Sequence, residues 1–199
     1  EPGPKIVALI SLSSNRIVRR IAYFVSPHGF GHAARAAAVM QAIADGQADV
    51  VFDIFTTIPS WFFQDSMSVP FVYHKLLTDI GLAQKTAFQT DLQQTLRRLN
   101  DFLPFRTSLI SGTAAVIKKL NSCLIINDIS PMGIPVAKKA GIPSVLVENF
   151  TWDWIYYPYV ATDSRFKRHI EYLKVMFEAA DYRVKNEPNC NPGQADLKT

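Results

Sequence analysis

The sequence predicts an α/β fold in which helices cover both faces of a parallel β-sheet. From Arg20 onward, short apolar segments rich in β-branched and aromatic residues alternate with stretches of helical periodicity, as in folds built from β-α-β units. The apolar segments are hydrophobic on both faces, which indicates strands that are covered on both sides. A length of 199 residues, 48% of them hydrophobic, suits one such domain with a sizeable core but not two.

Five strands and six helices follow from this alternation. The strands are expected at Ile21–Val25, Val50–Thr56, Phe71–Leu77, Leu124–Asn127 and Ser144–Val147. Four helices are expected to begin near Gly31, Ser60, Pro131 and Thr162, the last with an apolar face formed by Phe166, Ile170, Leu173, Phe177 and Ala180. The stretch Thr78–Ser122 is too long for a simple crossover, and it predicts two further helices, interrupted at Pro104, whose leucine-rich faces pack into the core.

The domain itself is expected to span residues 19–185. Residues 1–18 carry an apolar run after Lys5 that is too short to cross a membrane, and they are interpreted as a leader or remnant outside the fold. The segment 186–199 contains two prolines and a glycine with little apolar content, and it is interpreted as a linker or tail.

Charge and cysteine content argue against several classes of function. The net charge is +4, but the basic residues are scattered, so nucleic acid is not an expected partner. The two cysteines lie far apart, which signals neither a disulfide framework nor a zinc site and favours a cytoplasmic location. His28 and His32 are four residues apart but lack the glutamate of a metalloprotease motif, so no metal is expected. No other cofactor is expected.

A glycine-rich turn connects the first strand to an alanine-rich helix in RIAYFVSPHGFGHAARAAAVMQAI. Such a turn is where phosphate and sugar-phosphate chemistry is usually placed in α/β folds, because the helix start offers unpaired N–H groups and the positive end of its dipole. Gly29, Gly31 and Ala34 also satisfy a dinucleotide fingerprint. That alternative needs an acidic residue at the end of the second strand, where Asp53 is the candidate, although it lies inside the strand.

A family resemblance extends these observations. The strings SPHGFGHAAR and NDISPMGIPVAKKAGIPSVLVENFTWDWIYYPY resemble the glycosyltransferase-like region of plant L-arabinokinases and of predicted bacterial glycosyltransferases, over roughly Arg20 to Pro192. More distantly, the Gly-x-Gly-His turn resembles the first loop of the N-acetylglucosaminyltransferase that makes lipid II and of plant small-molecule glucosyltransferases. The resemblance implies a GT-B fold, in which two Rossmann-like domains face each other and the first binds mainly the acceptor.

The resemblance also implies roles for particular residues. In the plant glucosyltransferases a histidine after the first strand is the general base and an aspartate after a later strand holds it; His32 and Asp128 match these positions. Neutral imidazole can accept the proton of an acceptor hydroxyl near pH 7, and a carboxylate on its other nitrogen would fix the tautomer. Asp128 is expected to be free for this role because Ser130 and Pro131 form a helix cap and first turn.

Further side chains are candidates for substrate binding. Arg35 could meet an anionic group of the acceptor, although pairing at the surface is the favoured interpretation, and the insert Thr78–Leu103 is expected to contact the acceptor. Trp152 follows the fifth strand, where ligands of open α/β sheets gather, but could equally anchor a structured loop. The expected substrate-binding residues are His28, Gly29, Phe30, Gly31, Arg35, Asn149, Trp152 and Asp153.

The expected function is that of the acceptor-binding half of a glycosyltransferase. Nothing that resembles a nucleotide-binding second domain follows Asp181, so a nucleotide sugar is an expected partner mainly through a donor domain in cis or in trans. The chain alone is therefore expected to be inactive. Two alternatives stay open: a non-catalytic sugar- or nucleotide-binding regulatory module, and a dinucleotide-binding Rossmann domain.

Overall fold

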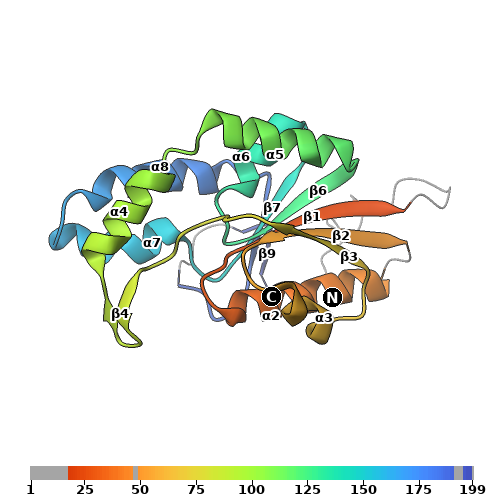
Figure 1. Cartoon of the computed structure of the whole chain (residues 1–199), viewed down its shortest axis with the longest axis horizontal. Helices are drawn as coiled ribbons and strands as arrows, with labels where there is room; N and C mark the ends of the chain where they lie inside the picture. Colours follow the sequence, from red (N-terminus) through yellow and green to blue (C-terminus); the bar gives the residue numbers. More distant parts are fainter. Residues whose placement is uncertain (1–17, 47–48, 191–194, 199) are drawn as a thin grey trace.

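The computed structural model describes residues 18–46, 49–190 and 195–198, which form a parallel sheet between two layers of helices (Figure 1). Within these residues the main sheet has seven strands in the order β3-β2-β1-β6-β7-β8-β9, and each neighbouring pair is parallel. The strands are β1 (Arg19–Val25), β2 (Val50–Thr56), β3 (Phe71–Lys75), β6 (Ser122–Asp128), β7 (Ser144–Glu148), β8 (Tyr182–Lys185) and β9 (Leu197–Lys198). The predicted fold class is confirmed.

The helices divide between the two faces of the sheet (Figure 1). One face carries α2 (Phe30–Gly46) and α3 (Ser60–Ser66). The other carries α5 (Thr107–Lys119), α6 (Gly133–Ala140) and α8 (Phe166–Glu178). Beyond the sheet lie α4 (Leu92–Phe102), α7 (Trp152–Tyr156), the 3-10 helix η1 (Tyr157–Ala161) and a hairpin of β4 (Gln84–Thr86) and β5 (Gln89–Thr90).

Strand β1 supplies both faces of the core because successive side chains of a strand point to opposite sides. Ile21, Tyr23 and Val25 pack in the cluster beneath α2 and α3. Ala22 and Phe24 belong to the opposite cluster, which also contains the buried side chains of α5, α6 and α8. This two-sided burial explains why the strands lack the polar alternation of a half-exposed sheet.

The insert between β3 and β6 contains the two predicted helices, separated around Pro104. Asp91 caps α4 by accepting a hydrogen bond from the backbone N–H of Gln94 at 2.8 Å. The predicted packing of the leucine face is confirmed, since Leu96, Leu99 and Leu103 are buried in the core. The short β4–β5 hairpin was not predicted, because its polar sequence carries no hydrophobic alternation.

Three boundaries differ from expectation. The helix after β6 begins at Gly133 and has no side-chain cap; the predicted cap at Ser130 is wrong, because its hydroxyl donates instead to the carbonyl of Thr78, with 3.4 Å between the oxygens. The helix expected near Thr162 begins at Phe166, since α7 and η1 occupy the preceding residues. The expected tail contributes β9, and the carboxylate of Asp196, just before this strand, accepts a hydrogen bond from the N–H of Arg183. The predicted leader at 1–18 lies almost entirely outside the described residues.

The order of the strands creates a crevice at one end of the sheet. The chain runs outward from β1 through β2 to β3 and then crosses back to β6 on the other side of β1. Ligands of open α/β sheets bind at the carboxyl ends of the strands where the order reverses in this way. Val25 and Asp128 are register partners at these ends, so the loop after β1 and the end of β6 meet there.

Candidate active site

The loop after β1 turns sharply into α2 at the crevice. Gly29 has a φ of 98°, a left-handed conformation that a side chain would disfavour. The backbone N–H of His28 points toward the Ser26 hydroxyl, with 3.4 Å between N and Oγ. Both glycines of the turn, Gly29 and Gly31, have open space where a Cβ would stand, so the start of α2 is accessible to a ligand. The loop therefore forms the predicted glycine turn, with an accessible helix start.

His32 and Asp128 are in hydrogen-bond contact at this end of the sheet. The imidazole Nδ1 lies 2.9 Å from Oδ1 of the fully buried Asp128 carboxylate. Since a carboxylate only accepts hydrogen bonds, Nδ1 carries the proton and Nε2 is the ring nitrogen with a free lone pair. Phe150 packs edge-on against the imidazole, with ring centroids 5.7 Å apart, and helps to fix its plane. The structure thus brings together the two residues that the resemblance matches.

Arg35 forms an ion pair with the buried Asp128. The interpretation favoured from the sequence, that Arg35 pairs at the surface, is therefore wrong. Its Nε lies 2.7 Å from Oδ2 and its terminal nitrogen 2.6 Å from Oδ1, a bidentate pair with a buried carboxylate. One helical turn separates Arg35 from His32, so both side chains reach Asp128 from the same face of α2. The guanidinium also lies 3.3 Å from Nδ1 of His32, but two donors cannot bond each other and this approach is not a hydrogen bond.

Asn149 completes the network from the end of β7. Its side-chain oxygen accepts a hydrogen bond of 2.8 Å from Arg35. Burial disfavours the charge of Arg35, but its hydrogen bonds and proximity to Asp128 outweigh this and raise its pKa. Four of the predicted site residues, from α2, β6 and the loop after β7, therefore form one hydrogen-bonded group in which the charge of Asp128 is balanced by Arg35.

His28 and Trp152 form a second group beside the first. The indole lies edge-on beneath the imidazole with centroids 5.1 Å apart, and it is 2% exposed. Gly81 closes against the other side of His28, since a Cβ at Gly81 would stand 2.2 Å from the imidazole Nδ1. Burial and the nearby charge of His32 lower the pKa of His28. Trp152 thus packs against His28, and its ring face is not exposed to a ligand.

Two predicted residues lie apart from these groups. Phe30 is half exposed and stacks on Phe62 of α3, with centroids 5.0 Å apart. Asp153 lies in α7, where one carboxylate oxygen is buried without a hydrogen bond from a described residue. Among the described residues, neither forms a hydrogen bond or a ring contact with the group around His32.

Asp53 pairs with Arg20 and His74, which argues against the alternative of a dinucleotide-binding domain. Its buried carboxylate accepts bonds from Arg20 at 2.6 and 2.9 Å and lies 3.0 Å from Nε2 of His74. In register it is opposite Ala22 in the middle of β1, away from the glycine turn. A ribose at the carboxyl ends of the strands would therefore find no free carboxylate at this position.

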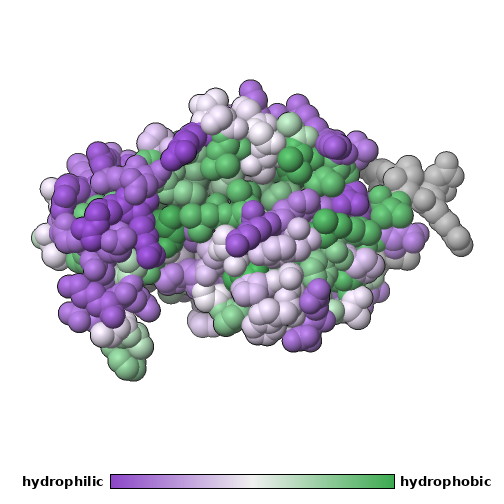
Figure 2. All heavy atoms as spheres, viewed as in Figure 1, coloured by the Kyte–Doolittle hydropathy of each residue, from purple (hydrophilic) through white to green (hydrophobic). Residues whose placement is uncertain are grey.

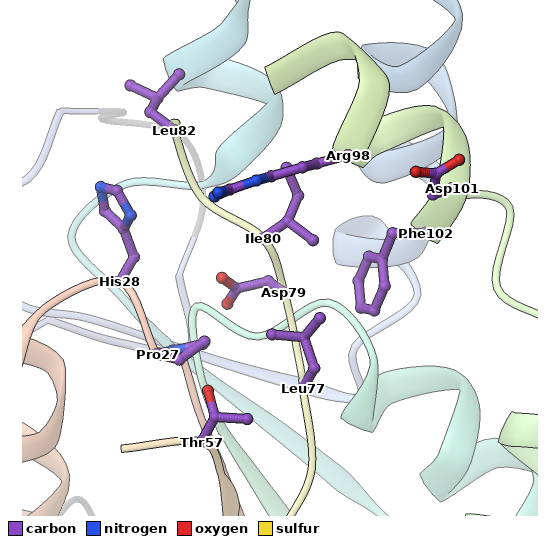
Figure 3. Close-up of a pocket in the computed structure, with 10 residues that line it drawn as sticks. All are labelled: Pro27, His28, Thr57, Leu77, Asp79, Ile80, Leu82, Arg98, Asp101 and Phe102. Carbon is purple, nitrogen blue, oxygen red and sulfur yellow. The ribbon is translucent and has the colours of Figure 1, made fainter. Parts of the chain in front are cut away.

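A cavity of about 580 Å³ opens beside the His28 group (Figure 3). Figure 3 shows Asp79 and Arg98 reaching toward His28 from the segment after β3 and from α4, while Leu77, Ile80 and Phe102 form apolar walls. The lining residues are Pro27, His28, Thr57, Leu77, Asp79, Ile80, Leu82, Arg98, Asp101 and Phe102. In Figure 2 hydrophobic side chains form a band beside the hydrophilic surface of α4.

Asp79, Gly81 and Arg98 lie within the insert Thr78–Leu103, which was expected to contact the acceptor, but the sequence did not single them out as site residues. Asp79 follows the third strand directly, a position that marks ligand contacts in α/β folds and could have indicated it. It was grouped instead with the long insert. Arg98 belongs to a polar helix face that resembles an ordinary solvated surface, so only its position over the cavity distinguishes it.

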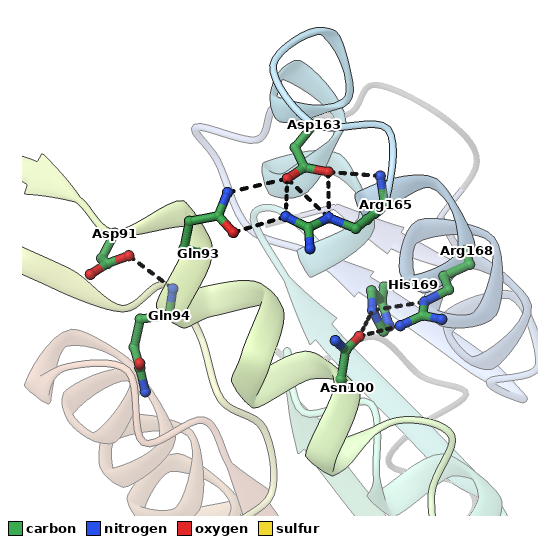
Figure 4. Close-up of polar contacts among 8 residues, drawn as sticks. All are labelled: Asp91, Gln93, Gln94, Asn100, Asp163, Arg165, Arg168 and His169. Carbon is green, nitrogen blue, oxygen red and sulfur yellow. Dashed lines mark hydrogen bonds and ion pairs between the residues drawn. The ribbon is translucent and has the colours of Figure 1, made fainter.

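The wall formed by α4 is fastened to α8 by polar side chains (Figure 4). Asn100 of α4 accepts hydrogen bonds from Arg168 and from Nε2 of His169, the latter at 2.8 Å. Near the start of α4, Gln93 bonds both Arg165 and Asp163, which themselves form an ion pair. Together with the buried leucines, these contacts hold one side of the cavity in place.

The described residues contain neither a candidate metal cluster nor a membrane-spanning helix. No group of three or more histidine, cysteine or acidic side chains among them could hold a metal ion. No helix in this part of the chain is long and apolar enough to cross a membrane.

Solved structures that match this fold include GT-B glycosyltransferases. UGT2 of Phytolacca americana, solved with UDP-2-fluoroglucose and pterostilbene, superposes on 84% of this chain with a TM-score of 0.53 and 12% identity. UGT71G1 of Medicago truncatula, solved with UDP-glucose, also covers 84%, with a TM-score of 0.51 and 16% identity. The chain is a GT-B glycosyltransferase-like domain, and it spans 48% and 45% of those two chains.

Sequence comparison relates the domain to one curated protein in particular. L-arabinokinase of Arabidopsis thaliana is 31% identical over 153 residues, which are 76% of this chain but 14% of that protein. The predicted resemblance is confirmed. No family model matches the chain.

Proposed function

We propose that this domain binds the acceptor of a glycosyl transfer reaction and that His32 is its general base. The observation that carries the proposal is the 2.9 Å contact between Nδ1 of His32 and the buried carboxylate of Asp128 at the carboxyl ends of β1 and β6. It leaves Nε2 as the basic nitrogen of an oriented imidazole at the crevice. The neighbouring cavity, lined from the loop after β1 and from the insert, is the proposed acceptor site.

The chemistry requires one proton acceptor at this place. As the acceptor oxygen attacks the anomeric carbon of a nucleotide sugar, its proton passes to Nε2 of His32 and the bond to the nucleotide diphosphate breaks. The imidazolium that forms is stabilised by Asp128, although Arg35 already balances part of that charge. The contribution of Asp128 is therefore chiefly to orient the ring. An inverted configuration at the sugar is the outcome expected of such a direct displacement.

The nucleotide sugar is assigned mainly to a second domain. This chain spans less than half of the UDP-bound neighbours, and a few exposed N–H groups at the start of α2, worth about 1 kcal/mol each, do not offset the cost of immobilising a ligand. Pterostilbene in one neighbour supports an acceptor that carries a hydroxyl group on an apolar body.

The alternative of a non-catalytic binding module has one observation in its favour. Arg20, Asp53 and His74 form a second Arg–Asp–His group in the same domain, with Nε2 of His74 3.0 Å from Asp53. That group lies at the middle of β2, so an imidazole on a buried carboxylate is not by itself a mark of catalysis. Position at the crevice distinguishes His32, and the two histidines provide a matched test.

The test compares His32→Gln with His74→Gln in the complete protein that carries this domain, after a screen of nucleotide sugars has identified the donor. Loss of general base catalysis should lower kcat by roughly 10²–10⁴-fold for His32→Gln. His74→Gln should leave kcat within about twofold. Equal turnover of the two variants would favour the non-catalytic module. Asp128→Asn is less informative, because it also leaves Arg35 without its partner.

A further inference from the structure

Asp79 is held above the sheet by its neighbour in the chain. The hydroxyl of Thr78 donates to the carbonyl of Val25 at 2.8 Å, and the carbonyl of Thr78 lies 3.4 Å from the Ser130 hydroxyl. These contacts attach the segment after β3 to the ends of β1 and β6. The Asp79 carboxyl group is thereby fixed at the crevice, beside the cavity that it lines.

The Asp79 carboxyl group is buried without a partner. The residue is 2% exposed, and neither of its oxygens accepts a hydrogen bond from a described residue. Ser26 and Trp152 lie close enough to lower its pKa, but neither meets the geometry of a hydrogen bond to it, and the Trp152 N–H also has no partner among the described residues. An unsatisfied buried polar group is costly, so its retention in a cavity wall indicates a ligand that satisfies it.

The ionisation of Asp79 is consistent with this indication. Burial and, to a lesser extent, the charge of Asp128 raise its pKa against the opposing effects of Ser26, His32 and Trp152, and the net result is a pKa of about 7. His28 and Arg98 also face the cavity. Near neutral pH the carboxyl group is therefore present in both forms, and it can donate a hydrogen bond as well as accept one.

The rest of the cavity narrows the class of ligand. Leucine, isoleucine, phenylalanine and proline side chains form its apolar walls, which suit an apolar or aromatic body. A hydroxyl group can both donate to and accept from Asp79. An ammonium group would be repelled by the guanidinium of Arg98, and a carboxylate group would be repelled by Asp79 and Asp101.

We propose that Asp79 is a specificity-determining residue that binds a hydroxyl group of a largely apolar acceptor in this cavity. The inference rests on the proposed function only in calling the ligand an acceptor. His32 would take the proton of the reacting hydroxyl, while Asp79 holds and orients the molecule at the wall of the cavity.

The test measures binding to this chain without any donor sugar. The probes are 2-naphthol and 2-methoxynaphthalene, which share an apolar body but differ in the hydroxyl proton, titrated by ligand-observed NMR at pH 7. We expect 2-naphthol to bind about tenfold more tightly, a difference of about 1.4 kcal/mol. Asp79→Leu should equalise the two affinities, whereas Asp79→Asn should keep a preference because the amide also donates and accepts.

Asp65→Asn is the matched control, since Asp65 is an exposed aspartate of α3 that does not line the cavity. It should leave the preference unchanged. An equal affinity of the wild-type chain for both probes, or an undiminished preference in Asp79→Leu, would overturn the proposal. Because no sugar transfer is measured, this test can fail while His32 is shown to be catalytic, and it can succeed where no transfer is found.

A second measurement covers the case in which Asp79→Leu does not fold. Carboxyl-carbon NMR of aspartate-labelled wild-type protein, with Asp79→Asn for assignment, should show Asp79 titrating near pH 7. Saturating 2-naphthol should shift that midpoint, and 2-methoxynaphthalene should shift it much less. A midpoint that responds equally to both probes, or to neither, would mean that the carboxyl group does not bind the hydroxyl.

Discussion

Replacing Arg35 by methionine should destabilise the domain by about 3 kcal/mol. The substitution removes the two hydrogen bonds of 2.7 and 2.6 Å to Asp128 and leaves a carboxylate that is fully buried. Hydrogen bonds to charged groups are worth about 1.5–3 kcal/mol each, and removing one partner of a buried pair costs about 3–5 kcal/mol. The lower part of that range applies because Arg35 is 18% exposed, which lets water reach the site, and methionine retains the aliphatic packing.

Urea unfolding, monitored by circular dichroism, measures this loss in the free energy of unfolding. For a domain of this size the midpoint of thermal unfolding should fall by roughly 6–12 °C, at about 2–4 °C per kcal/mol. The matched control is Arg97→Met, because Arg97 is exposed on a helix and bonds only Gln94 among the described residues. A surface change of that kind should alter the free energy of unfolding by no more than about 0.5 kcal/mol.

Asp128→Asn provides the second half of the experiment. The residues are in direct contact, so the double variant should lose less stability than the sum of the two single losses. Additive losses, or a stability of Arg35→Met within about 0.5 kcal/mol of wild type, would refute the assignment of Arg35 as the buried partner of Asp128. In that case Arg35 would be available to bind an anionic group of the acceptor.

Two further perturbations test the walls of the cavity. Gly81→Ala should lower the free energy of unfolding by about 1–3 kcal/mol, because Gly81 has a φ of 54° and a Cβ would stand 2.2 Å from His28. As a control, Gly112→Ala should raise the free energy of unfolding by about 0.5–1 kcal/mol, because Gly112 lies in a helix with open space around it. Equal effects of the two substitutions in thermal unfolding would contradict this prediction. Burial and the nearby charge of Arg168 together lower the pKa of His169 to about 4. The folded state therefore binds fewer protons than the unfolded state, and the contribution of His169 to stability is lost as the pH falls from about 6.5 to 4. His169→Gln should therefore reduce the acid sensitivity of the unfolding free energy in that window, and an unchanged pH profile would mean that His169 is not held neutral by its contacts with α4.

Much of the architecture follows from local sequence patterns. The strands are continuous apolar runs, and their burial on both faces is what such runs predict. The glycine turn and the start of α2 were predicted because Gly29 permits a left-handed conformation and the alanine-rich segment favours a helix. Asp128 was predicted from its position at the end of a strand together with the family resemblance.

Other parts of the site depend on contacts that sequence patterns do not encode. The helix expected to be capped at Ser130 begins later, because the Ser130 hydroxyl lies against the carbonyl of Thr78, 52 residues away in the chain. Arg35 was expected to pair at the surface, but its side chain bonds Asp128, 93 residues further on. Periodicity predicts which face of a helix is buried, not which buried carboxylate a long side chain will meet.

The sequence by itself determined the fold class and the glycine turn, since these depend on hydrophobic pattern and backbone conformation, whereas the pairing of His32 with Asp128 was implied by the family resemblance. The tertiary structure alone decided which of two similar groups lies at the crevice. Arg20, Asp53 and His74 repeat the residue types of Arg35, Asp128 and His32. The physical reason is topological: the strand order reverses between β1 and β6, so the ends of those two strands border an open crevice, whereas Asp53 lies inside the sheet opposite the middle of β1.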